Sequence, residues 1–137
     1  MIGAVIDTST LISALGWEGK PQQVLYCCLD KRFKLVLSPE ILEEAKEVMF
    51  RKKFAFIDSD KKNEFILLLS QLAEIAYPTH RVDICRDKDD NKFIEAALSA
   101  KANVIVSSDG DLLALKVYEG IEILSPSEFL GLLERKS

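Results

Sequence analysis

The chain has 137 residues, of which 48% are hydrophobic and 29% charged, so we expect one globular domain over residues 1–137. Its apolar runs are far shorter than the ~20 residues of a membrane span, which predicts no membrane association. The net charge of −4 argues at first against a nucleic-acid partner, because phosphate binding usually needs a basic surface.

The first 37 residues of the chain alternate apolar runs with helical patterns. Residues 2–6 are a short apolar run typical of a buried parallel strand, and the run ends at Asp7. Hydroxyl side chains precede a predicted helix over residues 11–15, and Pro21 suits the first turn of the next helix. Residues 33–37 predict the second strand.

The middle of the chain is mainly helical. Ser38-Pro39-Glu40 is a clear helix start, and Glu44 lies beside or within the apolar stripe of that helix. A second long helix is predicted from about residue 60 to residue 76. Residues 82–85 predict either a short strand or an extended lead into a helix that begins at Asp90.

The last third returns to strands. Residues 103–107 predict a strand that is followed by Asp109 and Asp111, and residues 121–124 predict another before the terminal helix. Strands that alternate with helices predict an α/β fold, a three-layer α/β/α sandwich. Its central sheet is expected to be mainly parallel, with four to five strands.

Acidic residues stand at the strand-to-helix junctions of this predicted fold: Asp7, Glu44, Asp90, Asp109 and Asp111. Because the carboxyl ends of parallel strands meet at one edge of a sheet, we expect these side chains to converge there. Carboxylates close together repel one another, and a hard cation such as Mg²⁺ or Mn²⁺ relieves that repulsion. With these acids set aside the remaining charges nearly balance, so the net acidity does not exclude a nucleic-acid substrate.

Such a cluster predicts metal-dependent hydrolysis of a phosphodiester. Two divalent ions ~3.5–4 Å apart stabilise the phosphoryl oxygens, deprotonate a water and assist the leaving group without any histidine. Ser9 and Ser107 are placed to orient ligands or waters by hydrogen bonding. Each acid taken singly is also typical of a helix cap or a turn, so the prediction depends on their joint position.

Other chemistries have little support in the sequence. His80, the only histidine, falls in a predicted surface loop, and there is no GxSxG elbow or glycine-rich phosphate loop. The cysteine count is odd, at three, and there is no CxxC spacing, which argues against a disulfide framework and against a zinc site. With no signal-peptide pattern at the amino terminus, we expect a cytoplasmic protein.

Four segments resemble the motifs of the PIN-domain family, the PilT amino-terminal-like nucleases. Each segment pairs a strand or a helix start with an acid: Val5-Ile6-Asp7-Thr8-Ser9, Ser38-Pro39-Glu40-Ile41-Leu42-Glu43-Glu44, Asp87-Lys88-Asp89-Asp90-Asn91 and Val106-Ser107-Ser108-Asp109. Spacing within the second motif favours Glu44 over Glu43, and spacing within the third favours Asp90 over Asp89. In the fourth, where Thr-x-Asp is common, this chain has Ser107.

The resemblance spans essentially the whole chain and implies an activity. It implies a Mg²⁺- or Mn²⁺-dependent endoribonuclease in which Asp7, Glu44, Asp90 and Asp109 are catalytic and bind metal, with Asp111 in support. Arg51-Lys52-Lys53-Phe54 and Asp111-Leu112-Leu113 look most like the VapC-like subgroup of toxins from toxin–antitoxin pairs. That subgroup implies an RNA substrate, a homodimer and an antitoxin protein as partner.

Two other function classes remain open at this stage. A receiver-like phosphoacceptor domain also binds Mg²⁺ at the strand edge of an α/β sandwich, but Asp7 is followed by Thr8-Ser9 where paired acids are expected. A non-catalytic nucleic-acid-binding module would keep the fold and an incidental acidic pocket. Acids at all the junctions favour the nuclease.

Substrate contacts are suggested by position alone. Arg86, Lys88 and Lys92 flank Asp90 and are the best candidates for contacts with a phosphate backbone. Trp17 and Phe54 are candidates for stacking on bases of single-stranded RNA, although packing residues would look the same. Apolar side chains near these positions suggest a dimer surface: Tyr26, Phe50, Phe54, Phe56 and Ile57.

Overall fold

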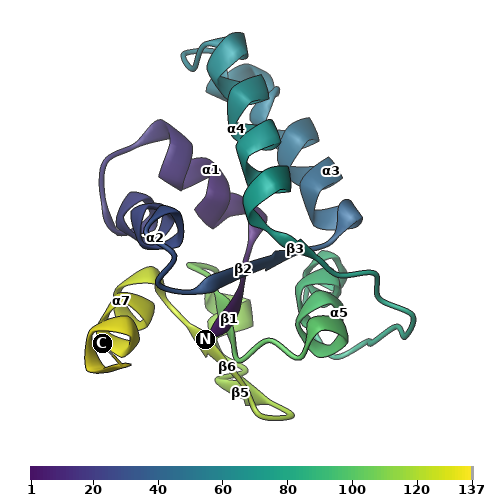
Figure 1. Cartoon of the computed structure of the whole chain (residues 1–137). Helices are drawn as coiled ribbons and strands as arrows, with labels where there is room; N and C mark the ends of the chain where they lie inside the picture. Colours follow the sequence, from purple (N-terminus) through teal and green to yellow (C-terminus); the bar gives the residue numbers. More distant parts are fainter. Residues whose placement is uncertain (137) are drawn as a thin grey trace.

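A mainly parallel sheet of six strands forms the centre of the protein (Figure 1). The structure is a computed structural model that describes residues 1–136. The strand order is β3-β2-β1-β4-β6-β5, and β5 alone runs antiparallel to its neighbour β6. The strands are β1 (Gly3–Ile6), β2 (Lys34–Leu37), β3 (Glu74–Ile75), β4 (Val104–Val106), β5 (Val117–Tyr118) and β6 (Ile121–Leu124).

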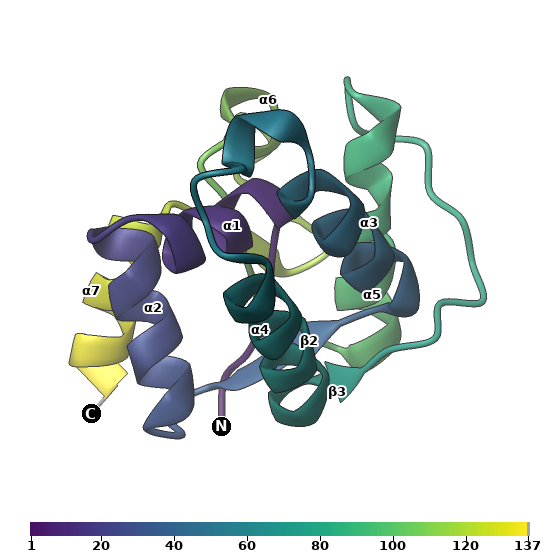
Figure 2. The same cartoon turned by 90° about the horizontal axis from the view of Figure 1, so that it is seen from above.

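Helices cover both faces of this sheet. The helices α1, α2 and α7 lie on one side and α5 lies on the other, packed against β1, β2 and β4 (Figure 2). Their bounds are α1 (Thr8–Gly16), α2 (Lys20–Leu29), α3 (Pro39–Met49), α4 (Ser59–Leu72), α5 (Asn91–Ala100), α6 (Gly110–Leu113) and α7 (Pro126–Lys136), with short 3₁₀ helices η1 (Lys52–Phe54) and η2 (Lys88–Asp90). The predicted α/β/α sandwich is therefore confirmed.

The core lies along the central strands. Val5 of β1 and Ile105 of β4 are completely buried, and these two residues are direct partners in the parallel pairing of the two strands. Continuous apolar runs suit such strands because helices cover them on both faces. The same pairing aligns Ile6 with Val106, so the residues that follow each strand emerge together at one edge of the sheet.

The sheet has more strands than the four to five predicted, because two very short ones were not recognisable. Helix α4 ends at Leu72, short of the predicted residue 76, and Glu74–Ile75 pair with the end of β2 as β3. The hairpin of β5 and β6 turns through Glu119 and Gly120, both at positive φ. Two-residue strands carry too little periodicity for a sequence pattern to reveal.

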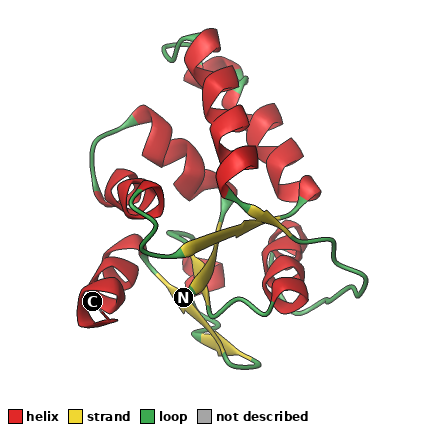
Figure 3. Ribbon diagram, in the orientation of Figure 1, coloured by secondary structure: helices red, strands yellow, loops and turns green. Residues whose placement is uncertain are grey.

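Residues 82–85 do not join the sheet. They belong to the long connection between β3 and η2 that Figure 3 shows as an extended loop. The side-chain oxygen of Asn91 accepts hydrogen bonds from the N–H groups of Ile84 (3.2 Å) and Cys85 (2.9 Å). Of the two readings that the sequence left open, the extended lead into α5 is the correct one. Within residues 1–136, no helix has the length and apolar character needed to span a membrane.

Candidate functional site

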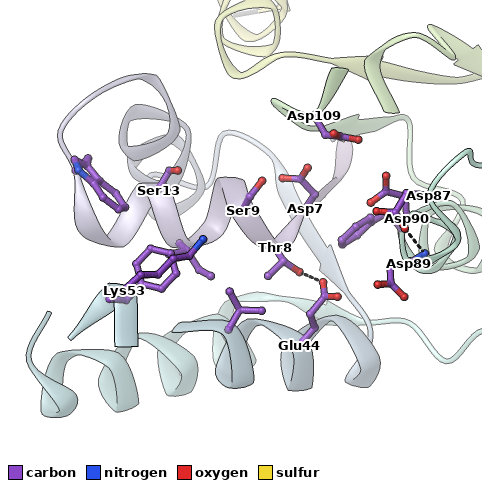
Figure 4. A pocket seen from close by; sticks show the side chains of 15 residues that line it. Asp7, Thr8, Ser9, Ser13, Glu44, Lys53, Asp87, Asp89, Asp90 and Asp109 are labelled. Carbon is purple, nitrogen blue, oxygen red and sulfur yellow. Dashed lines mark hydrogen bonds between the residues drawn. The ribbon is translucent and has the colours of Figure 1, made fainter. Parts of the chain in front are cut away.

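A pocket of about 640 Å³ opens at the carboxyl edge of the central strands. Figure 4 shows acidic side chains from four separate parts of the chain gathered toward one end of it. The acids that line the pocket are Asp7, Glu44, Asp87, Asp89, Asp90 and Asp109. All four residues predicted to be catalytic are therefore in its wall.

Asp7 is the most deeply buried of these acids, with 4% of its surface exposed. It follows β1 and caps α1, because its Oδ1 accepts a hydrogen bond from the N–H of Thr10 at 3.0 Å. Its Oδ2 accepts a second hydrogen bond from the hydroxyl of Ser107 at 2.5 Å. Burial raises the pKa of Asp7 above its usual value, although these hydrogen bonds oppose the shift.

Ser107 links Asp7 to Asp109. Its hydroxyl donates to Asp7 and accepts from the backbone N–H of Asp109 at 2.9 Å, and the serine is fully buried. Asp109 in turn caps α6 by accepting from the N–H of Leu112 at 3.1 Å. One hydroxyl thus fixes the relative position of two carboxyl-bearing residues, and the predicted role of Ser107 in orienting ligands or waters stays a prediction.

Asp90 shows that the carboxylates interact strongly. It occupies the position before α5 but makes no side-chain cap, so its carboxyl is free to face the other acids. Burial, a hydrogen bond with the Asp109 side chain and the charges of Asp109, Asp87 and Asp7 raise the pKa of Asp90 to about 7. A carboxylic acid with this pKa marks a place where negative charge is crowded.

The nearby thiol of Cys85 responds to the same field. Burial first, and then the charges of Asp90, Asp87 and Asp109, raise the pKa of Cys85 to about 11. A thiol with so high a pKa is protonated at neutral pH and is a poor nucleophile. Cys85 is therefore a packing residue beside the site, in line with the sequence, which gave no support for cysteine chemistry.

Glu44 enters the pocket from α3, but its charge is already balanced. Its Oε1 accepts a hydrogen bond from the hydroxyl of Thr8, and its Oε2 forms an ion pair with Nζ of Lys92 at 2.5 Å. Lys92 is a predicted substrate contact, yet only 8% of its side chain is exposed. Glu43 is exposed and does not line the pocket, which agrees with the predicted register of this helix.

The remaining predicted site residues differ in whether they line the pocket. Asp111 does not line the pocket, and its carboxylate instead lies 3.7 Å from a guanidinium nitrogen of Arg86. Ser9 lines the pocket from α1. Lys88 is exposed and lines a smaller neighbouring depression together with Asp89. His80 is exposed, as its position in a loop predicted.

Three residues of this site were not identified from the sequence. Asp87 lines the pocket, and its charge contributes to the raised pKa of Asp90. Its position in the acidic run Asp87-Lys88-Asp89-Asp90 is the signal that could have identified it. Thr8 holds Glu44 through a hydrogen bond between residues 36 positions apart, and Asn91 holds the 84–85 backbone from six and seven positions away. Tertiary contacts such as these leave no mark in a local sequence pattern.

The donor set suits a hard divalent cation, but the side chains are not yet arranged around one. Among residues 1–136, no three acidic, histidine or cysteine side chains form a ready-made metal site. Asp7, Asp90 and Asp109 nevertheless offer only oxygen atoms, and the charge of Asp109 contributes to the raised pKa of both Asp7 and Asp90. Carboxylate oxygens are what Mg²⁺ and Mn²⁺ prefer, and a cation among them would remove the repulsion.

A family model described as a PIN domain matches residues 3–111, which include all of the acids described above. The chain belongs to the PIN domain family. PIN domains are generally nucleases that use divalent metal ions, so the family and the acidic pocket agree on metal-dependent nuclease chemistry.

Two individual proteins are similar to this PIN domain. Uncharacterized protein MJ1680 from Methanocaldococcus jannaschii is 35% identical over 121 residues, which cover 84% of this chain and 76% of that protein. The crystal structure of PAE2754 from Pyrobaculum aerophilum superposes with a TM-score of 0.67 over 98% of this chain and 90% of that one. The sequence identity to that structure is 14%, so the match shows a common fold alone.

Proposed function

We propose that this PIN domain is an endoribonuclease that hydrolyses phosphodiester bonds of RNA with Mg²⁺ or Mn²⁺. One observation carries the proposal: Asp7, Asp90 and Asp109 come from separate segments and meet in one pocket, where burial and then the neighbouring acids raise the pKa of Asp90 to about 7. Nothing in ordinary packing favours such crowding of carboxylates, whereas a divalent cation does.

The residues around the cluster have separate tasks in this proposal. When bound, the metal ion supplies charge stabilisation for the phosphoryl oxygens and a nucleophilic water. Asp7, Asp90 and Asp109 would hold it, and Ser107 would fix Asp7 relative to Asp109 through its two hydrogen bonds. Glu44, held by Thr8 and Lys92, would complete the acidic wall on the α3 side.

The biological setting that we propose is the toxin half of a toxin–antitoxin pair in the cytoplasm. Its support is the resemblance of Arg51-Lys52-Lys53-Phe54 and Asp111-Leu112-Leu113 to that subgroup. Exposed aromatic side chains at Tyr26, Phe50 and Phe56 are suitable for a homodimer or an antitoxin contact. The three cysteines are all free thiols, which suits a reducing compartment.

Cleavage of a labelled, mixed-sequence single-stranded RNA tests the activity. Wild type is compared with Asp7→Asn in Mn²⁺ and in EDTA, and Glu64→Gln on the exposed side of α4 serves as the matched control. We expect cleavage by wild type and by Glu64→Gln in Mn²⁺ only, and a loss of at least about 100-fold in Asp7→Asn. Equal cleavage by Asp7→Asn, or cleavage that persists in EDTA, would contradict the proposal.

A further inference from the structure

The pocket continues from the carboxylates to an end of different chemistry. Beyond the acids its wall consists of Ile12, Val48, Trp17 and Phe54, with Lys53 beside them. Figure 4 shows Lys53 at the opposite end of the pocket from Asp89 and Asp90. The same cavity therefore has a carboxylate-lined end that is suited to a metal ion and an opposite end lined by aromatic side chains and a lysine.

Helix α1 runs along the pocket between these two ends. Ser9 and Ser13 line the pocket one helical turn apart, so they lie along one side of α1, and Trp17, which also lines the pocket, is the residue directly after the helix. These three residues form a row that follows α1, and at 1.5 Å per residue its helical part from Ser9 to Gly16 is about 10 Å long. The serine hydroxyls thus line a path that leads from the acids to the indole ring.

The aromatic end is closed by the segment that contains η1, which packs tightly on the end of α1. At Gly16 a Cβ atom would lie only 3.1 Å from Cδ1 of Ile57 and 3.8 Å from the Phe56 ring. Glycine therefore allows this segment to approach α1 closely. The approach brings Phe54 and Phe56 against Trp17.

Trp17 makes edge-to-face contacts with the rings of Phe54 and Phe56 and remains partly exposed. Its centroid lies 6.1 Å from that of Phe54 at an interplanar angle of 79°, and 5.4 Å from that of Phe56 at 65°. Trp17 as a residue is 49% exposed, and Nζ of Lys53 lies 5.1 Å from the Phe54 centroid. An exposed aromatic ring beside a cation is the surface on which unpaired nucleobases stack while the phosphate chain stays nearby.

We propose that this aromatic end binds an unpaired base of the strand whose phosphodiester lies at the carboxylates. The substrate class is then single-stranded nucleic acid, because a base inside a duplex is stacked and paired and cannot present its face to Trp17. This inference rests on the proposed nuclease function and adds a specificity-determining residue to it. The base that is bound lies a short distance along the strand from the scissile bond, at the far end of the Ser9–Ser13–Trp17 row.

Trp17 is the only tryptophan of the chain, so its fluorescence reports directly on this end of the pocket. Wild-type protein in Ca²⁺ is titrated with single-stranded RNA, with the same strand in a duplex, and with strands that are abasic in their 5′ or 3′ half. We expect quenching by the single strand but not by the duplex, and weaker quenching by one of the two abasic strands. Binding of the single strand, followed by anisotropy of a labelled RNA, should weaken about 5- to 100-fold in Trp17→Leu and much less in Trp17→Phe.

Tyr77→Leu is the matched control, since Tyr77 is a 70% exposed aromatic residue that does not line the pocket. If wild type cleaves RNA but neither the affinity nor KM changes in Trp17→Leu, the inference is wrong and the nuclease function stands.

A change of sedimentation mass in Trp17→Leu with unchanged RNA binding would instead assign the ring to a protein contact. If wild type neither binds nor cleaves RNA in Mn²⁺, the proposed function fails and this inference fails with it. Should Trp17→Leu not fold, the wild-type comparison of abasic and normal strands decides the question.

Discussion

Asp7 and Asp109 each serve the fold and the pocket with the same side chain. Each caps a helix by accepting a hydrogen bond from a backbone N–H, and each lines the acidic end of the pocket. The sequence allowed a cap or a site at these positions, and the structure shows that the two readings are compatible. A cap fixes a carboxylate in place at little cost, which is useful for any residue that must hold a ligand.

Asp90 makes the stability of the metal-free protein depend on pH in an unusual direction. Its folded-state pKa of about 7 lies above the ordinary value of 3.8, so the folded protein holds a proton that the unfolded chain releases. The stability that this group contributes is full below about pH 4 and is lost as the pH rises through 7. We expect Asp90→Asn to raise the Tm of the metal-free protein at pH 8 by a few degrees and to have little effect at pH 4.

Thermal denaturation in EDTA from pH 4 to pH 8 measures this effect. Asp89→Asn, which changes an exposed neighbouring acid, should leave the pH profile close to that of wild type. A lower Tm for Asp90→Asn than for wild type at pH 8 would show that the ionised Asp90 carboxylate does not destabilise the folded protein.

Lys92 acts as a built-in counter-ion for Glu44. Lys92→Met leaves a partly buried carboxylate without its cation, which should cost about 1–3 kcal/mol of folding free energy without metal. The same change removes a positive charge from the pocket wall, so the affinity for Mn²⁺ should rise at least about threefold. Chemical denaturation measures the loss of stability, and calorimetric titration measures the affinity for Mn²⁺. The exposed Lys88→Met is the control for both. Weaker Mn²⁺ binding by Lys92→Met would contradict the prediction and would mean that Lys92 is needed to hold Glu44 in place.

At the scale of elements, α5 organises the acidic end of the pocket through its first two turns. Asn91 accepts from the N–H groups of Ile84 and Cys85, and Glu95, one turn later, accepts from the N–H of Val82 at 3.0 Å. These bonds tie the long loop after β3 to the helix. The loop then leads directly into η2, which carries Asp90.

Asn91→Ala should loosen this attachment without touching the carboxylates. It leaves the N–H groups of Ile84 and Cys85 without their acceptor, which should cost about 1–3 kcal/mol. Hydrogen exchange should accelerate at these two amides, and Mn²⁺ affinity should fall because Asp90 is held less firmly. Asn63→Ala, on the exposed side of α4, is the control, and unchanged exchange at both amides would show that the loop is held by other contacts.

Sequence patterns were informative where an element is long or has a recognisable start. Ser38-Pro39 and the apolar runs of β1, β2 and β4 predicted these elements to within a residue or two. The short strands β3 and β5 escaped detection because pairing with a neighbour, and not local preference, creates them. The acids of the pocket could be named from their junction positions, whereas the ion pair of Lys92 with Glu44 joins residues 48 positions apart and could not.

At the scale of the whole molecule, the parallel sheet brings the residues of the candidate site together. Asp7 and Ser107 are 100 positions apart in the sequence, yet they are in contact because β1 and β4 pair in register and end together. The chain as a whole carries a net charge of −4, and a concentration of acids at one edge accounts for that excess. The fold thus concentrates negative charge at the point where a divalent cation would be bound.

The most direct test of this account is a crystal structure of the protein soaked in Mn²⁺, with the ion located by its anomalous scattering. We predict a Mn²⁺ ion coordinated by carboxylate oxygens of Asp7, Asp90 and Asp109, at metal–oxygen distances of about 2.1–2.3 Å. An ion bound elsewhere, or a pocket that stays free of Mn²⁺ at millimolar concentration near pH 8, would contradict the assignment of these acids as the metal centre.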